Sequence, residues 1–233
     1  MIIAIANTKG GCGKTTTVDM MATMLAERGK KILAIDGDWQ AKLTRISGVK
    51  IKDKTLYDVI INKVDIVDAI VENTASGYDI VPGSMKLLDT NRQPLHGVLK
   101  NTLSSVIDQY EYIIIDTPPT PGTQLKLCLD SADCIVIPTQ GHRHDCLMLE
   151  SLALEIEEVK RDNSSLYVAG ILQTFYNPEN TMNSRDKEYL NIATESLKTK
   201  VFEARIMDMN AVADFSMYKN CYALFIDEFM KET

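Results

Sequence analysis

A glycine-rich stretch at residues 9–15, Lys-Gly-Gly-Cys-Gly-Lys-Thr, carries the residue types of a phosphate-binding loop. Glycines allow backbone N–H groups to approach phosphate oxygens, because no Cβ atom stands in the way. In such a loop Lys14 would reach the β- and γ-phosphates of a nucleotide, and the Thr15 hydroxyl would ligate Mg²⁺. A helix beginning near Lys14 would add its unpaired N–H groups and the positive end of its dipole. The spacing therefore predicts a nucleotide site that uses magnesium.

Carboxylates follow two of the apolar runs that have the pattern of buried strands. Residues 112–116 end in Asp116, and residues 31–35 are followed by Asp36 and Asp38. Open α/β sheets bind ligands at the carboxyl ends of their strands, so we expect these carboxylates near the phosphates. Asp116 has the position of an aspartate that holds Mg²⁺ through a water molecule, although it could simply begin a turn. A carboxylate after the other strand could position the water that attacks the γ-phosphate.

The glycine-rich stretch departs from the strict phosphate-loop pattern, which places a glycine five residues before Gly13, where this chain has Thr8. With its additional Lys9, the stretch resembles the signature of the ParA/MinD family of deviant Walker ATPases. The resemblance implies binding of ATP with Mg²⁺ and an ATP-bound homodimer, in which Lys9 reaches the nucleotide of the partner subunit. The nucleotide-binding residues that it implies are Lys9, Gly10, Gly11, Cys12, Gly13, Lys14, Thr15 and Thr16.

Residues 36–40 correspond to switch I of this family, which there has the sequence D-x-D-P-Q. The resemblance implies that Asp38 orients or activates the attacking water and that Asp36 supports the surroundings of the metal. Trp39 stands where the family has proline, and this only tryptophan of the chain would pack over the switch or at an interface. The catalytic residues implied in this way are Asp38, Lys14 and Lys9, and the metal residues are Thr15, Asp116 and Asp36.

Further segments are similar to the family along most of the chain. Residues 117–122 match switch II, whose prolines couple loss of the γ-phosphate to the dimer surface. Residues 138–140 match a segment near the dimer interface. The family takes its adenine contacts from the loop after residue 172 and from residues 205–212, where the sequence assigns no single residue.

The elements that position these residues alternate along the chain, which predicts a doubly wound, mostly parallel sheet with helices on both faces. Expected strands are 2–6, 31–35, 78–82, 112–116, 134–138, 167–172 and 201–206, and expected helices are 15–28, short ones within 50–74, 95–109, 145–160, 183–199 and the end of the chain. We find no repeat and no linker, so we expect one P-loop ATPase domain over residues 1–233.

Composition narrows the class of protein. The chain has 233 residues with 45% apolar and 24% charged residues, as in ordinary globular proteins, and no apolar stretch long enough to cross a membrane. We expect no secretion signal, and five cysteines without a C-x-x-C pair indicate reduced thiols in the cytoplasm. His142 and His144 could suggest a metal, but the lack of a third ligand favours a solvated loop.

The family divides according to the surface that its members bind. The last eleven residues carry three acidic side chains and one basic one, which disfavours a membrane helix, so their apolar stripe (Leu224, Phe225, Phe229, Met230) is expected to dock on the core. The net charge of −7 argues against strong DNA binding but leaves weak, non-specific binding by a dimer open. Candidate DNA-binding residues are Arg185, Lys187, Lys198, Lys200, Arg205 and Lys219, although Asp208 follows where the family is often basic.

We therefore expect a small ParA-type ATPase without a helix-turn-helix extension, which partitions a DNA element or positions a cargo. A ParB-like or other activator protein would stimulate its slow hydrolysis of ATP to ADP and phosphate, in the cytoplasm or on the nucleoid. The alternatives are a dimeric scaffold with negligible turnover, a MinD-like positioning ATPase, or a metabolic enzyme that resembles dethiobiotin synthetase or the nitrogenase iron protein.

Overall fold

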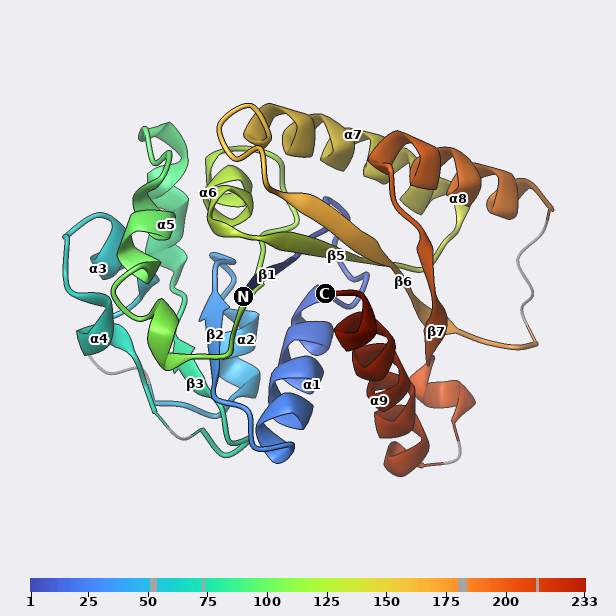
Figure 1. The fold of residues 1–233 in the computed structure, drawn as a ribbon, viewed down its shortest axis with the longest axis horizontal. Helices are drawn as coiled ribbons and strands as arrows, with labels where there is room; N and C mark the ends of the chain where they lie inside the picture. Colours follow the sequence, from blue (N-terminus) through green and yellow to red (C-terminus); the bar gives the residue numbers. More distant parts are fainter. Residues whose placement is uncertain (51–53, 73, 180–183, 213) are drawn as a thin grey trace.

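The computed structural model describes residues 1–50, 54–72, 74–179, 184–212 and 214–233 (Figure 1). Its centre is a seven-stranded sheet in which every pair of neighbouring strands is parallel, in the order β3-β2-β4-β1-β5-β6-β7. The strands are β1 (Ile2–Ile5), β2 (Ile32–Asp36), β3 (Asp79–Val81), β4 (Tyr112–Asp116), β5 (Cys134–Thr139), β6 (Tyr167–Tyr176) and β7 (Val201–Met207). The doubly wound parallel sheet expected from the sequence is therefore confirmed.

The central strands of the sheet are mostly apolar because helices cover both faces of the sheet. In β4 the side chains alternate, so Ile113 and Ile115 join the core on one face while Ile114 joins the core on the other. This explains why the strand sequence is continuously apolar and not alternating.

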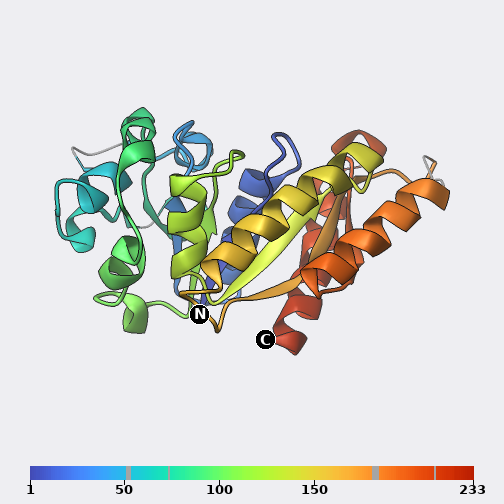
Figure 2. The same ribbon diagram turned by 90° about the horizontal axis from the view of Figure 1, so that it is seen from above.

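Helices α1 (Lys14–Glu27) and α9 (Phe215–Glu232) cover one face of the sheet, with the short α2 (Lys42–Ile46) beside them (Figure 1). The opposite face carries α6 (Thr123–Ser131), α7 (Arg143–Val159) and α8 (Ser184–Leu197), and Figure 2 shows α7 and α8 lying next to each other across the sheet. The remaining elements are α3 (Leu56–Ile60), α4 (Ile66–Ala69), α5 (Val98–Leu103) and the 3₁₀ turns η1 (Met85–Arg92), η2 (Ile107–Gln109) and η3 (Met209–Ala211).

Two expectations about helices need correction. Residues 95–109 are helical only over α5, after which the chain tightens into η2, and α6 was not expected. On α9, Phe225 and Phe229 are fully buried as expected, but Leu224 is 64% exposed and Met230 is 36% exposed. Both lie off the buried stripe because only residues three or four apart share a helix face. Within the described residues, no helix is long and apolar enough to cross a membrane.

Both outer strands of the sheet have part of their free edge bonded. The Glu228 carboxylate on α9 accepts hydrogen bonds from the β7 amides of Glu203 and Ala204, at 2.8 and 2.9 Å. At the other edge, Val71 forms an antiparallel bridge to Ile80 of β3, with bonds of 2.8 and 3.0 Å. These edges therefore present fewer open backbone groups than a bare strand would.

Candidate functional site

The glycine-rich segment forms a loop between the end of β1 and the start of α1. Gly13 immediately precedes α1 with φ +92°, and Gly11 has φ +73°, a backbone conformation that disfavours residues with a Cβ atom. Among the described residues, no side chain caps the N-terminus of α1, and its first turn contains no acidic residue. The unpaired N–H groups of this helix end are therefore available to an anion, as the sequence predicts.

The loop is held in place by the strands and the helix around it. The Asn7 amide donates to the Pro138 carbonyl at 2.7 Å, and its own oxygen accepts from the Lys9 amide at 2.9 Å. The Thr174 hydroxyl donates to the Cys12 carbonyl at 2.8 Å. Because these partners belong to β5 and β6, the loop has a fixed position above the carboxyl ends of the central strands.

The Lys14 side chain is almost fully buried and folds back over the loop. Its ammonium group donates to the Lys9 carbonyl oxygen at 2.8 Å, and the Cys12 sulfur lies 3.9 Å away. Burial raises the pKa of the Cys12 thiol, so this cysteine remains protonated inside the loop. Lys14 is thus a cation placed at the hollow that the loop encloses.

The Lys9 ammonium forms an ion pair with Asp145, in the first turn of α7 of the same chain. The Asp145 side chain is fully buried and that of Lys9 is 30% exposed. The Thr8 hydroxyl donates to the Met148 carbonyl at 2.9 Å, so a second bond joins the loop to α7. Asp145 could not be singled out from the sequence, because an aspartate in the first turn of a helix is common without any further role.

Three carboxylates meet at the carboxyl ends of β2 and β4. Asp36 and Asp116 are paired neighbours across these strands, and Asp38 lies two residues beyond Asp36. Burial, followed by the negative charge of Asp36, holds the pKa of Asp116 well above its usual range, while the Thr15 hydroxyl and the Lys14 ammonium lower it. In the described part of the chain, neither oxygen of Asp116 has a hydrogen-bond partner of regular geometry.

A buried carboxylate without partners fits a divalent cation. Mg²⁺ prefers oxygen ligands and keeps several waters, so one carboxylate, one hydroxyl and the substrate phosphates suffice to bind it. Asp116 and Thr15 supply these two groups, and the described residues contain no cluster of three or more His, Cys, Asp or Glu side chains that could hold a metal. The His144 side chain lies outside the described residues.

Asp36 is already engaged by the protein. One of its oxygens accepts from the Thr44 amide at 2.8 Å and from the Thr44 hydroxyl at 2.6 Å. Burial raises the pKa of Asp36 to about 6, although these bonds lower it. Its carboxylate therefore fastens α2 beneath the hollow, which agrees with a supporting role and leaves Asp116 as the freer ligand.

Asp38 is nearly buried and lies where switch I meets the hollow. Burial raises its pKa, whereas a 3.0 Å bond from the Gln40 amide and the charge of Lys14 lower it. Trp39 is half-buried and packs against the core on the side of α6 and α7. The tryptophan thus packs against the core, an environment that differs from the switch or interface positions expected from the sequence.

The hollow at the loop has a volume of about 180 Å³ and is lined by Gly10, Gly11, Gly13, Lys14, Thr15, Thr16, Asp38, Lys42, Pro119 and Phe175. A second hollow of about 160 Å³ shares Gly13, Thr16 and Phe175 with it and extends to Ile206, Met207, Asp208, Met209, Asn210, Tyr218 and Tyr222. The segments expected to contact adenine, after residue 172 and within 205–212, lie there. Lys42 and Phe175 are site residues that the sequence analysis missed, although Lys42 lies only four residues after Asp38.

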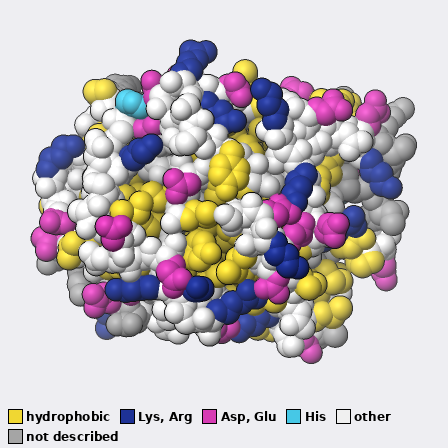
Figure 3. Space-filling model, in the orientation of Figure 1, with side chains coloured by type: hydrophobic (Ala, Val, Ile, Leu, Met, Phe, Trp, Pro, Cys, Tyr) yellow, Lys and Arg dark blue, Asp and Glu magenta, His cyan; other side chains and the backbone are white. Residues whose placement is uncertain are grey.

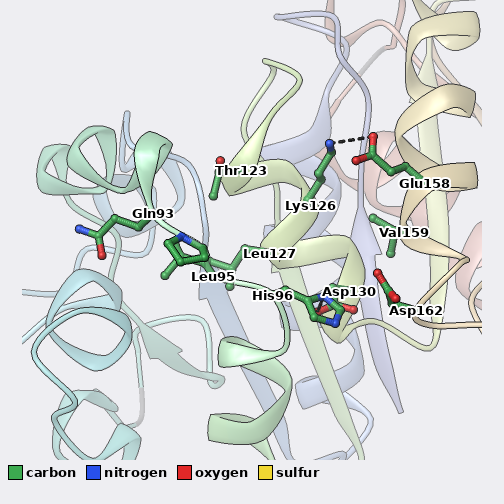
Figure 4. A pocket seen from close by; sticks show the side chains of 11 residues that line it. Gln93, Leu95, His96, Thr123, Lys126, Leu127, Asp130, Glu158, Val159 and Asp162 are labelled. Atoms are coloured by element: carbon green, nitrogen blue, oxygen red, sulfur yellow. Dashed lines mark ion pairs between the residues drawn. The ribbon is translucent and has the colours of Figure 1, made fainter.

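Another hollow, of about 260 Å³, lies along α6 between the segment before α5 and the end of α7 (Figure 4). Its charged side chains face one another: Lys126 pairs with Glu158 at 2.8 Å and His96 with Asp130 at 3.2 Å. Because its lysine is paired with Glu158, and Asp130 and Asp162 add further carboxylates, the lining of this hollow does not match a nucleotide phosphate.

The candidate DNA-binding cations are in different local settings. Lys200 pairs with Glu232, Lys219 pairs with Glu27 at 2.6 Å, and the Arg205 guanidinium lies 4.8 Å from the Tyr176 ring centre. Lys187 and Lys198 belong to α8 and its C-terminal end, and the Arg185 side chain lies outside the described residues. On the face drawn in Figure 3, Lys and Arg side chains are interspersed with Asp and Glu.

The sequence of this chain matches a family model and known relatives. The model of a family described as an AAA domain matches residues 1–168. The sporulation initiation inhibitor protein Soj of Bacillus subtilis is 33% identical over 181 residues, which are 74% of this chain and 72% of Soj.

Solved structures match over nearly the whole length. A plasmid partition protein from Borrelia burgdorferi has a TM-score of 0.80 at 26% identity, covering 100% of this chain and 98% of that one. The cobyrinic acid a,c-diamide synthase from Mycobacterium smegmatis, solved with ADP and magnesium, has a TM-score of 0.84 at 25% identity, covering 99% of this chain and 94% of that one.

Proposed function

Because the chain belongs to the ParA family of deviant Walker P-loop ATPases, we propose that it is an ATP-driven dimerisation switch for partition or positioning. It is an ATPase that uses ATP with Mg²⁺. Its cargo is a DNA element such as a plasmid, or another cellular body moved by the same cycle. The buried and unpartnered carboxylate of Asp116, beside Thr15 and the glycine-rich loop, carries the proposal.

The nucleotide lies across the two adjoining hollows. Backbone N–H groups of the loop and of the start of α1 bind the phosphates, and Lys14 moves from the Lys9 carbonyl to the β- and γ-phosphates. The base occupies the second hollow, between Phe175 and the segment from Ile206 to Asn210. Thr15 and Asp116 hold Mg²⁺, which when bound neutralises charge on the phosphate oxygens.

Hydrolysis depends on positioning a water molecule in line with the γ-phosphate. Asp38 lines the phosphate hollow and accepts from that water, which directs the lone pair of the water at phosphorus. Asp36 does not touch the reacting atoms; through Thr44 it fixes the backbone on which switch I rests. Pro119 of switch II lines the same hollow and so contacts the place where the γ-phosphate is lost.

Lys9 reaches the nucleotide of the partner subunit only after it leaves Asp145. Exchange of this ion pair for a phosphate contact supports a cycle in which ATP favours the homodimer and ADP favours the separate chains. The Lys9 side chain is partly exposed, so it can leave without unfolding the loop. The loop and α7, which the pair joins, belong to one domain that spans residues 1–233.

The ATP-dependent dimerisation cycle also indicates which partners the protein binds. A ParB-like or other activator protein stimulates hydrolysis, and the dimer binds DNA weakly and without sequence preference in the cytoplasm, on the nucleoid. Of the candidate cations, Lys198 and Arg205 have no carboxylate ion pair among the described residues, whereas Lys200 and Lys219 do. The paired charges and the net charge of −7 support weak, salt-sensitive binding.

Two variants test the proposal. Lys14→Ala should abolish ATP binding, because it removes the cation at the phosphates, whereas Asp38→Ala should keep binding and lose turnover. Calorimetric titration with ATP and release of phosphate, measured on both variants and on the unchanged chain, separate these effects. Normal hydrolysis by Asp38→Ala would show that another group orients the water.

A second candidate is a biosynthetic ligase, which the likeness to the diamide synthase favours. Such an enzyme would use ATP to activate a carboxylate for attack by an amine or ammonia. Phosphate release that needs an added carboxylic acid, and does not change with protein concentration, would support the ligase over the dimerising switch.

A further inference from the structure

Lys42 is a second cation at the phosphate hollow. It is the first residue of α2 and lines the hollow together with Lys14 and Asp38. Its side chain is exposed, and in the described residues no hydrogen bond or ion pair holds its ammonium group. The other lysines of the site are engaged, since Lys9 pairs with a carboxylate and Lys14 donates to a carbonyl.

The backbone beneath Lys42 has a well-defined position. Thr44, two residues further along α2, donates from its amide and hydroxyl to the buried Asp36 carboxylate. The same hydroxyl accepts from the Gly83 amide at 2.9 Å, which ties α2 to the end of β3. Ala41, just before Lys42, has φ +48° and turns the chain into the helix. Lys42 is therefore a flexible side chain on a fixed base at the rim of the hollow.

The residues that line the hollow would contact different parts of a nucleotide. The loop residues bind the phosphates that ATP and ADP share, and Lys14 also reaches the γ-phosphate. Asp38, Lys42 and Pro119 also line the hollow, and the proposed role of Asp38 places the γ-phosphate near these residues. We propose that Lys42 binds the γ-phosphate of ATP within its own chain and makes the site prefer ATP over ADP. This inference rests on the function proposed above.

Electrostatics support this placement. Asp38 lines the hollow, and Asp36 and Asp116 lie at the ends of the neighbouring strands β2 and β4. Carboxylates there oppose a triphosphate, so a cation near the γ-phosphate adds to the binding. Lys42 and Asp38 line the same hollow, so Lys42 lies near the group beside which the γ-phosphate would lie.

The test compares two nucleotides on four proteins. Calorimetric titrations with Mg²⁺ and either the non-hydrolysable analogue AMPPNP or ADP are made on the unchanged chain, Lys42→Gln, Lys42→Arg and Lys50→Gln. Lys50 is a matched control, since it is an exposed lysine near α2 that does not line the hollow. Lys42→Gln should weaken AMPPNP binding by about tenfold or more, the expected loss for a charge-assisted hydrogen bond, and change ADP binding by less than about twofold.

Lys42→Arg should keep most of the preference because it keeps the charge, and Lys50→Gln should leave both affinities unchanged. The loss should not change with protein concentration, because the contact lies within one chain. Equal losses for both nucleotides, or no loss, would overturn the γ-phosphate role while leaving nucleotide binding intact. If the unchanged chain bound neither nucleotide, the proposed function would fail first, and the role of Lys42 with it.

Discussion

Replacing Lys9 with alanine should destabilise the chain even before any dimer forms. The variant leaves Asp145, whose side chain is fully buried, without its counter-charge. Breaking one side of a buried ion pair costs about 3–5 kcal/mol. Because Lys9 is 30% exposed, water reaches part of this pair, and we expect the lower value, about 3 kcal/mol in the free energy of unfolding. For a chain of this size the midpoint of thermal unfolding would fall by about 6–12 °C.

Adding Asp145→Asn to Lys9→Ala should recover most of this loss, because the buried group is then neutral. Asp145→Asn alone should lower the free energy of unfolding by only about 1 kcal/mol. It leaves a lysine that water can hydrate, and it removes a favourable negative charge at the start of α7. The double-mutant cycle should therefore show a coupling of about 2 kcal/mol or more. Urea unfolding of all four proteins without nucleotide measures it.

The cycle also separates the structural effect of Lys9 from its effect on dimers. If Lys9 contacts the partner's nucleotide, the stable double variant should remain monomeric with ATP in sedimentation experiments. Equal stability of Lys9→Ala and the unchanged chain would refute the argument, because it would mean that Asp145 does not depend on this lysine.

Three further predictions concern the acidic cluster, α9 and the DNA surface. The pKa of Asp36 rises from 3.8 to about 6 on folding, because the buried carboxyl group favours its protonated form. The contribution of this group to the free energy of unfolding is therefore full below pH 3.8 and is lost as the pH rises through 6. The stability difference between Asp36→Asn and the unchanged chain should therefore shift by about 2.4 kcal/mol in favour of the variant between pH 4 and 8, in urea unfolding with EDTA. Phe229→Ala should cost about 3–5 kcal/mol and Leu224→Ala less than about 0.5, and similar losses would contradict the buried face assigned to α9. Neutralising Lys198 and Arg205 should weaken binding of the ATP-bound dimer to random duplex DNA equally for all sequences, as measured by fluorescence anisotropy, and binding that ignores salt would argue against phosphate contacts.

The sequence predicted best those features that a single short segment of the chain forms by itself. Residues 112–116 form β4 with the expected bounds, because an unbroken apolar run that ends in aspartate suits a strand buried on both faces. The loop residues 9–15 likewise lie together, since a glycine-rich turn between a strand and a helix brings its own backbone groups to one point. Local sequence was sufficient for both predictions.

The sequence could not predict contacts that depend on tertiary packing. Asp145 meets Lys9 across 136 residues, and only the placement of α7 over the sheet brings the two together. To predict that Leu224 is exposed, one must know which face of α9 packs against the core. A short apolar stretch leaves this orientation ambiguous. Lys42 was overlooked because its helix is five residues long, too short for a periodic pattern.

The bonded outer strands of the sheet restrict how copies of this chain can associate. A second copy that approached β7 would find the Glu203 and Ala204 amides already bound by Glu228, and one that approached β3 would find Val71 in place. Strand-to-strand growth, the route to fibres and to other permanent aggregates, is thereby discouraged at both ends of the sheet. Association is left to side chains and loops, whose contacts can form and separate many times without the backbone changing partners.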